Sequence, residues 1–343
     1  MSPTTNPKWI RTGPVFPRDS VGPDVMGDPC VVWDPEIGVW RMVMFLDPPG
    51  HADSISRSPT GDPGSWTRPE PLRFANPEEF PAGGGAQKPF IVMDATRPNH
   101  AARVDGRYWL LIVGFSGVAR EKRIQRAWAT SLAGPWTVEP GDLIPRGGPG
   151  SADENHTDAV TGFWFEDRHE FVYYHMGYPL SPQPYPTSPY GNALCVATQK
   201  LGDPVVKRGV MIAPMAKPGH WTAGYLGAFQ ILPGHKHRWI GVLNASPTPP
   251  DRLGNKTSEE PPPSLGGFAF SEAEFPIEGW TVADSPFEWM EDIPQLAKAA
   301  GEGVNFWRQH IFIADGTTRL FYNTGAYGTE RMFSKLLDGE TLD

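Results

Sequence analysis

Residues 28–47 read DPCVVWDPEIGVWRMVMFLD, an apolar run, a turn with Asp, Pro and Gly, and a second run rich in aromatic residues. Two apolar runs separated by such a turn are typical of a β-hairpin. Residues 54–72, SISRSPTGDPGSWTRPEPL, continue with a third run of small residues and a turn that leads to Trp66. The stretch therefore predicts a small antiparallel sheet of three or four strands.

The same unit recurs along the rest of the chain. When the copies are aligned on their second strands, successive copies lie 69, 63, 67 and 81 residues apart. The positions used for this alignment are Trp40, Trp109, Val172, Trp239 and Leu320. The last spacing is long because a Pro-rich polar loop, residues 246–264, is inserted in the fourth copy. Five copies therefore fill the chain.

Small sheets repeated in this way predict an all-β, five-bladed β-propeller in one domain, since each blade buries its faces against its neighbours. The fifth copy lacks the closing Trp strand of the others, and KWIRTGPVF at residues 8–16 has that character. We expect this N-terminal segment to close the ring; an independent surface strand is the alternative. The expected blades span roughly residues 28–75, 88–145, 157–210, 225–285 and 303–340, the last with residues 8–16 added. Residues 287–301 predict a short linker helix.

The composition agrees with many short strands. The 343 residues include 38 Gly and 39 Pro, which would interrupt long helices, so a helical bundle is excluded. Apolar residues make up 39% of the chain and aromatic residues 12%, enough for a core, so general disorder is excluded too. The net charge of −9 and the absence of Lys/Arg clusters argue against nucleic acid or an anionic membrane as partner. A neutral or cationic small molecule is the expected partner, with no prediction for the oligomeric state.

Segments that would direct the chain to or across a membrane are not evident. Residues 1–12 contain no apolar run of signal-peptide length, and no run approaches the 18 or so apolar residues of a membrane span. Cys30 and Cys195 are far apart in apolar runs, which favours two buried free thiols. These features predict a cytoplasmic protein.

Several of these features together carry a family resemblance. The Asp-Pro pair at residue 28, the alternation of turn and strand that ends in sequences such as SLAGPW at residues 131–136, and the count of five units resemble the five-bladed propeller glycoside hydrolases. That superfamily includes families 32, 43, 68, 117 and 130. The resemblance implies a funnel on the central axis, with acidic residues on the innermost strands of different blades. It also implies a small carbohydrate as substrate.

Two acidic residues match positions that are catalytic in this superfamily. The resemblance implies that Asp28 is the base of an inverting enzyme or the nucleophile of a retaining one, and that Asp158, at the equivalent point of the repeat in blade three, orients the sugar. Glycosidic cleavage needs such carboxylates because its transition state resembles an oxocarbenium ion. The alternative for Asp28 is an Asp-Pro turn that begins a strand. Four other Asp residues lie in hairpin turns, where Asp is favoured for backbone reasons.

The general acid departs from the family pattern. Family 43 has a Glu on the inner strand of blade four, but residues 219–232 here contain no carboxylate. Glu302 is the favoured replacement, because it precedes the innermost strand of blade five in a Gly-flanked loop. Glu154, His156 and His220 are the other candidates, and a His can donate a proton at neutral pH.

Further polar and aromatic residues are expected to bind the sugar, since hydroxyls need donors and ring faces need apolar contact. The set comprises Lys88, His156, Glu154, His220, Trp221, Tyr225, Trp307, Arg308, Gln309 and His310. For each aromatic residue, a place in the propeller core is the alternative. No metal motif or cofactor motif is present, so no catalytic metal or cofactor is expected. His310 falls near the place where family 43 often has an axial His that accompanies a calcium ion or a water in the channel. The resemblance therefore leaves a structural cation in the channel open.

Three functions remain open from the sequence. The first is a glycoside hydrolase that cleaves a short oligosaccharide or glycoside, and the resemblance favours inversion. The second is a phosphorylase that resembles family 130, with phosphate held by basic residues such as Lys88, Arg120, Arg123 and Arg308. The third is a propeller that binds a sugar or metabolite without hydrolysing it, because the blade-four Glu is missing.

Overall fold

The chain folds almost entirely into β-strands. The computed structural model describes residues 7–16, 25–47, 52–81, 85–115, 122–179, 192–215, 217, 219–247, 264–288, 306, 308–325, 330–339 and 341–343. Within these residues the only helices are two 3-10 turns, Pro77–Glu79 and Glu166–Arg168. The all-β fold class is confirmed.

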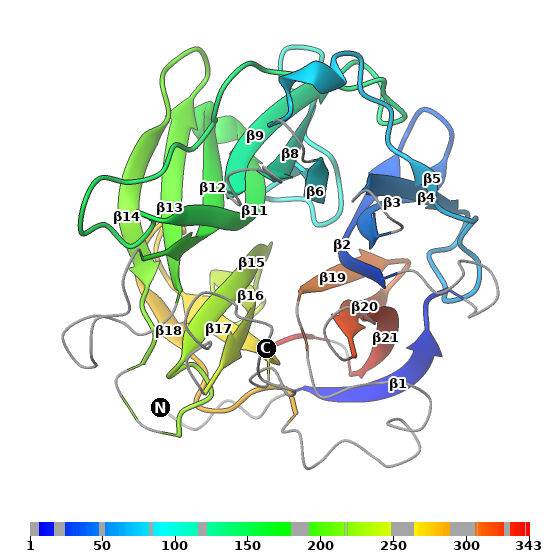
Figure 1. Ribbon diagram of the computed structural model, residues 1–343. Helices are drawn as coiled ribbons and strands as arrows, with labels where there is room; N and C mark the ends of the chain where they lie inside the picture. Colours follow the sequence, from blue (N-terminus) through cyan, green and yellow to red (C-terminus); the bar gives the residue numbers. More distant parts are fainter. Residues whose placement is uncertain are drawn as a thin grey trace.

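Five sheets, antiparallel except for one short strand, surround a central axis (Figure 1), and the prediction of a five-bladed propeller is confirmed. Blade one contains β2 (Val25–Asp34), β3 (Val39–Asp47), β4 (Ala52–Ser58) and β5 (Glu70–Pro71). Blade two contains β6 (Ala86–Ile91), β8 (Tyr108–Phe115), β9 (Lys122–Ala129) and β10 (Thr137–Val138). Blade three contains β11 (His156–Phe165), β12 (Glu170–Tyr178), β13 (Ala193–Lys200) and β14 (Val206–Ile212), with β7 (Met93–Asp94) parallel to β11. Blade four contains β15 (Tyr225–Pro233), β16 (Trp239–Ser246), β17 (Leu265–Ser271) and β18 (Trp280–Val282). Blade five contains β19 (Gln309–Ala314), β20 (Thr317–Thr324), β21 (Arg331–Asp338) and the N-terminal strand β1 (Lys8–Pro14).

Aromatic side chains fill the space between neighbouring blades. Between blades three and four, the rings of Tyr174 and Phe229 lie 5.1 Å apart edge to face. Phe229 in turn meets Trp280 of its own blade at 4.9 Å. Such pairs add to the stability gained from burial alone. Both cysteines are buried free thiols, as the sequence predicted, and burial raises the pKa of each to about 12.

The N-terminal strand β1 lies outermost in blade five. It pairs antiparallel with β21 from Lys8 opposite Asp338 to Pro14 opposite Phe333. The two residues that follow, Val15 and Phe16, are buried in an apolar cluster with side chains of blade one. The strand thus has the expected position, and its role in holding the ring closed stays a prediction.

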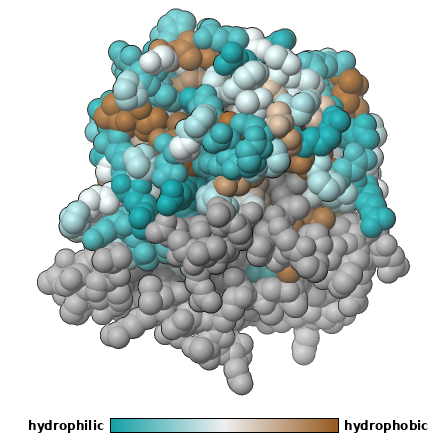
Figure 2. All heavy atoms as spheres, turned by 45° about the horizontal axis from the view of Figure 1, so that its top comes forward, coloured by the Kyte–Doolittle hydropathy of each residue, from teal (hydrophilic) through white to brown (hydrophobic). Residues whose placement is uncertain are grey.

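On the face of the molecule that Figure 2 shows, the coloured residues are mostly hydrophilic. In Figure 2, apolar residues appear as separate spots between polar ones on the visible face. No described helix is long and apolar enough to cross a membrane. Most of the expected linker helix at residues 287–301, and most of the inserted loop at residues 246–264, lie outside the described residues.

Candidate active site

The five inner strands β2, β6, β11, β15 and β19 lie nearest the axis (Figure 1). In four of them, two residues near the start of the strand face a single residue of the next strand, which is a β-bulge. These bulges are residues 28–29, 88–89, 159–160 and 227–228. The first bulge residue in blades one to three, Asp28, Lys88 and Ala159, has a positive φ of 54°, 56° and 48°. Such strain in residues other than Gly occurs preferentially at functional sites.

The carboxylate of Asp28 lies on the bulge of blade one. The residue is 7% exposed, and its backbone N–H points to Oδ1 of Asn323 on β20 at 3.5 Å. The same oxygen accepts the backbone N–H of Arg308 at 3.0 Å, so one amide links the starts of two inner strands. No cationic side chain among the described residues pairs with Asp28. No cation of the described part of the chain therefore neutralises this carboxylate.

The expected equivalence of Asp28 and Asp158 is wrong by one residue. Asp158 pairs with Met176 immediately before the bulge, so its counterpart in blade one is Gly27, and Ala159 occupies the position of Asp28. A bulge residue turns its side chain differently from the residue before it. The two carboxylates therefore approach the axis from different points of their strands.

Asp158 is fully buried and is held by two lysines from blade two. Its Oδ2 accepts bonds from Nζ of Lys88 at 2.9 Å and Nζ of Lys122 at 2.6 Å, and lies 3.3 Å from the Tyr178 hydroxyl. Its Oδ1 accepts the backbone N–H of Ala159 at 2.7 Å. Burial alone would raise the pKa of this carboxyl, but the two ammonium groups outweigh burial and lower it well below its usual range. Asp158 is therefore a permanent anion and cannot donate a proton near neutral pH.

Arg308 extends from the start of blade five toward blades two and three. Its Nη2 donates to the carbonyl oxygen of Val160 on β11 at 3.0 Å, and its guanidinium lies 5.6 Å from the ring centre of Phe90 on β6. Because the side chain reaches from the start of blade five to two other inner strands, β6 and β11, the guanidinium lies at the axis. The residue is 2% exposed.

His310 joins blades five and one. Its Nε2 accepts the backbone N–H of Val31 at 3.2 Å and lies 2.9 Å from the amide nitrogen of Asn99. Burial, followed by the charge of Arg308, lowers the pKa of His310 to about 3. With Nε2 engaged by two donors, that nitrogen has no lone pair for a sugar or a cation. The geometry of His310 supports a structural role in place of the expected substrate contact.

Two other expected sugar contacts are packed into the blades. Trp221 is completely buried, its Nε1 donates to the carbonyl of Ala283 at 2.7 Å, and its ring occupies the space where a side chain on Gly267 would lie. Trp221 is therefore a core residue, and the prediction that it contacts the sugar is wrong. The amide of Gln309 donates to the carbonyl of Leu243 and ties blade five to blade four.

Tyr225 and His220 lie near the start of blade four. Tyr225 is 6% exposed, and burial raises the pKa of its hydroxyl to about 12, so the group can act only as a neutral donor or acceptor. The Nδ1 of His220 is 2.9 Å from the hydroxyl of Thr222. Burial, then the charge of Lys217, lowers the pKa of His220, which leaves the imidazole neutral and poorly suited to donate a proton.

Asp158 together with Lys88, Lys122 and Tyr178 makes up the Asp158 cluster. Of the remaining candidates, one bonds within its own loop, one packs against this cluster, and two lie beyond the described residues. Glu154 accepts the backbone N–H of Gly150 at 2.8 Å within its own loop. The ring of His156 packs edge to face on Tyr178 at 5.9 Å, next to the cluster. Glu302, the favoured general acid, and Trp307 lie outside the described residues.

Sequence reasoning missed Lys122 and Tyr178. Both lie at strand ends, Lys122 at the start of β9 and Tyr178 at the end of β12. Tyr178 reaches Asp158 from the neighbouring strand of the same blade, whereas Lys122 reaches it from blade two. The only sequence signal for these two residues was a polar side chain at the end of a strand.

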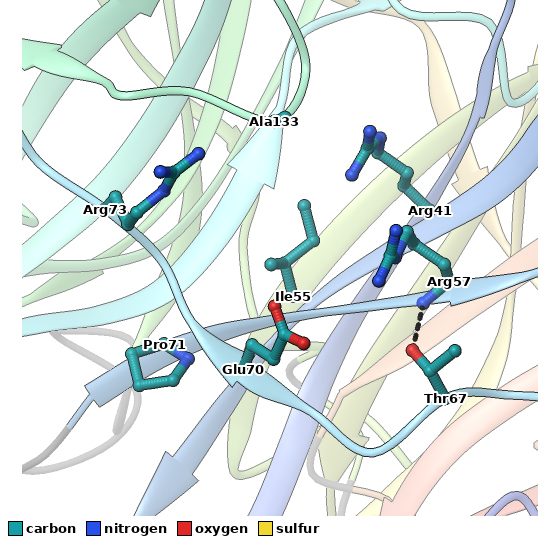
Figure 3. Close-up of a pocket in the computed structure, with 8 residues that line it drawn as sticks. All are labelled: Arg41, Ile55, Arg57, Thr67, Glu70, Pro71, Arg73 and Ala133. Carbon is teal, nitrogen blue, oxygen red and sulfur yellow. Dashed lines mark hydrogen bonds between the residues drawn. The ribbon is translucent and has the colours of Figure 1, made fainter. Parts of the chain in front are cut away.

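No group of three or more His, Cys, Asp or Glu among the described residues could hold a metal ion. A cavity of about 360 Å³ lies away from the axis, beside blade one, where Arg41, Arg57 and Arg73 surround it with Glu70 (Figure 3). A second, of about 450 Å³, is lined by blades two and three and includes Trp109. Neither cavity includes a residue of the Asp158 cluster.

Comparison with known proteins relates the fold to carbohydrate enzymes. No family model and no curated protein matches the chain in sequence. Solved structures do match over nearly its whole length, among them a complex of BT0996 and RGII (TM-score 0.70, 12% identity, 97% of this protein and 92% of that one). Another is the α-L-arabinofuranosidase from Podospora anserina in complex with cellotriose (0.61, 11%, 98% and 98%). A third belongs to the GH130 family of mannoside phosphorylases, which contains glycoside hydrolases that target β-1,2 mannosidic linkages in Candida mannan (0.63, 11%, 98% and 95%).

These structural neighbours are glycoside hydrolases of the five-bladed propeller type, as the resemblance implied. At 11 to 12% identity the likeness concerns the fold. Function must be argued from the side chains at the axis.

Proposed function

We propose that this protein is a glycosidase-type enzyme that cleaves a short oligosaccharide or glycoside at the propeller axis, with Asp28 as the reacting carboxylate. The observation that carries the proposal is the contrast between the two axial acids. Asp158 is neutralised by two lysines, whereas Asp28 has no cation beside it among the described residues and lies on a strained bulge. A carboxylate that activates water or attacks carbon must keep its electron pair available.

The two acids then have different tasks. Asp28 activates water in an inverting reaction, which we favour, or attacks the sugar carbon in a retaining one. Asp158 is fixed by four donors and keeps the lysines in place. It accepts a hydrogen bond from a hydroxyl of the sugar and stays an anion. Glu302 remains our proposed general acid. A separation of about 6.5–9.5 Å between the reacting carboxyls in a ligand complex would support inversion, and about 5–5.5 Å retention.

The test is Asp28→Asn, assayed against a panel of aryl furanosides and pyranosides with and without phosphate. We expect turnover to fall by about 10²–10⁴-fold, the usual contribution of such a group, while the unfolding transition stays unchanged. Asp105→Asn is the matched control, because Asp105 is an exposed hairpin residue with a positive φ that Asn also tolerates. Wild-type turnover in Asp28→Asn would refute the assignment.

Phosphorolysis is the second candidate, because cations gather at the axis. Lys88 and Lys122 share one carboxylate, and Arg308 lies beside the same inner strand. Turnover by the wild type that requires phosphate would identify a phosphorylase, and turnover without phosphate would identify a hydrolase.

A further inference from the structure

Three cationic side chains among the described residues are buried, and they differ in their partners. Arg41 is 6% exposed and forms an ion pair with Asp34, and Lys335 is 2% exposed and lies 2.8 Å from the carboxylate of Glu288. Arg308, 2% exposed, has no carboxylate partner among the described residues. Its Nη1 is buried with no hydrogen-bond partner.

Within the part of the chain that the structure describes, this arrangement leaves a positive charge uncompensated at the axis. A guanidinium cannot escape the cost of burial by losing its proton. The carbonyl of Val160 and the ring face of Phe90 are the contacts that stabilise it, and both are weaker than an ion pair. Buried charges in proteins are normally paired. The missing partner is therefore best supplied by a ligand.

The position of Arg308 connects it with the proposed site. Phe90 lies two residues after Lys88 on β6, and Val160 lies two residues after Asp158 on β11. The guanidinium is thus beside the bulges of β6 and β11, on which Lys88 and Val160 lie. A planar guanidinium with an unused N–H edge binds carboxylate or phosphate oxygens well.

We propose that Arg308 binds an oxyanion of the ligand, either the carboxylate of an acidic sugar or a phosphate. The acidic-sugar source rests on the proposed glycosidase function, whereas the oxyanion site itself does not. The proposal reverses the expectation of a neutral or cationic partner, which rested on the net charge of −9. Net charge describes the surface as a whole, but a ligand at the axis is governed by the local charges.

The experiment measures thermal unfolding and calorimetric binding of the full chain with inorganic phosphate, with glucuronate and galacturonate, and with glucose and galactose as neutral matches. We expect at least one anion to raise Tm by a few degrees at saturating concentration and the neutral sugars to have a smaller effect. Glucuronate or galacturonate alone would identify an acidic sugar, and phosphate alone would identify phosphate as the co-substrate. No binding of any anion would overturn the proposal.

Variants locate the site. Arg308→Met should remove the anion response while leaving Tm equal or higher, because it deletes an unpaired buried charge. Arg41→Met is the matched buried control and should lower Tm by several degrees, since it leaves Asp34 unpaired. Arg73→Met tests the off-axis cavity of Figure 3, where Arg73 is exposed; loss of the response in this variant, with Arg308→Met still responding, would overturn the proposal.

Because binding needs no turnover, the two proposals fail separately. Turnover of neutral glycosides without anion binding would overturn the oxyanion site and leave the glycosidase function intact. If the protein binds an anion but its Asp28→Asn variant keeps wild-type turnover, the oxyanion site stands and the proposed role of Asp28 in the glycosidase reaction is overturned.

Discussion

At the scale of single residues, the Asp158 cluster shows how the protein keeps a carboxylate in a buried place. The two ammonium groups that pair with it retain contact with water, since the side chains of Lys88 and Lys122 are 22% and 27% exposed. The carboxylate itself is not exposed. A ligand that approaches from solvent therefore meets the lysines before it meets the acid.

Replacing the carboxylate should be costly. In Asp158→Asn the two ammonium groups lose the carboxylate that they share, so we expect the free energy of unfolding at pH 7 to fall by about 3 kcal/mol, near the lower end for breaking a buried pair. Urea unfolding measures this, with Asp105→Asn as a control that should change it by less than about 0.5 kcal/mol. Because the folded pKa of Asp158 is lowered, its contribution is present above about pH 4 and is lost as pH falls further. The wild type and Asp158→Asn should therefore converge in acid; an equal difference at pH 7 and pH 3 would contradict this.

The sequence could place Asp28, Lys88 and Asp158 near one end of the inner strands, because each precedes a strand of the repeat. It could not pair Lys122 with Asp158, because that contact depends on two blades lying side by side. Nor could it decide that Trp221 belongs to the core, since a Trp in an apolar run suits both a sugar site and a packed interior.

At the scale of elements, the repeat of strands and turns was predictable and the bulges were not. Alternating apolar runs and Gly/Pro turns mark each strand in the sequence. A bulge adds one residue without changing the hydropathy of its strand, so it leaves no comparable signal. This is why the repeat pattern aligns Asp158 with Asp28, although it is Ala159 that matches Asp28 in register.

Strand β1 offers a test of ring closure. Deleting residues 1–16 removes the pairing with β21 and the burial of Val15 and Phe16. Each buried apolar side chain contributes about 1.5–3 kcal/mol, so we expect a loss of about 4 kcal/mol or more and a fall in Tm of about 5 °C or more. Ile10→Thr, on the exposed side of the same strand, should leave Tm nearly unchanged. If the deletion melts like the wild type, β1 is a surface strand and does not close the ring.

At the scale of the whole molecule, polar side chains join the inner strands around the axis. Gln230 of blade four donates to the carbonyl of Ile311 in blade five and accepts its N–H, at 3.0 and 2.7 Å. Asn99 donates to the carbonyls of Val31 and Ile311 at 3.1 Å and so joins blades one and five. His310 completes this junction, which lies where blade five meets blade one in the ring.

The junction predicts how the ring responds to acid. His310 has a pKa of about 3 in the folded protein and about 6.5 when unfolded, so below pH 6.5 only the unfolded chain takes up a proton there. Stability must then fall with pH, and this one residue should remove about 2 kcal/mol between pH 7 and pH 5. In His310→Gln the free energy of unfolding, measured in urea, should start lower at pH 7 and lose less on acidification. His235→Gln, an exposed control, should keep the wild-type slope. If His310→Gln also keeps that slope, the imidazole is protonated in the folded ring, and its bond to the backbone of blade one does not hold the blades together.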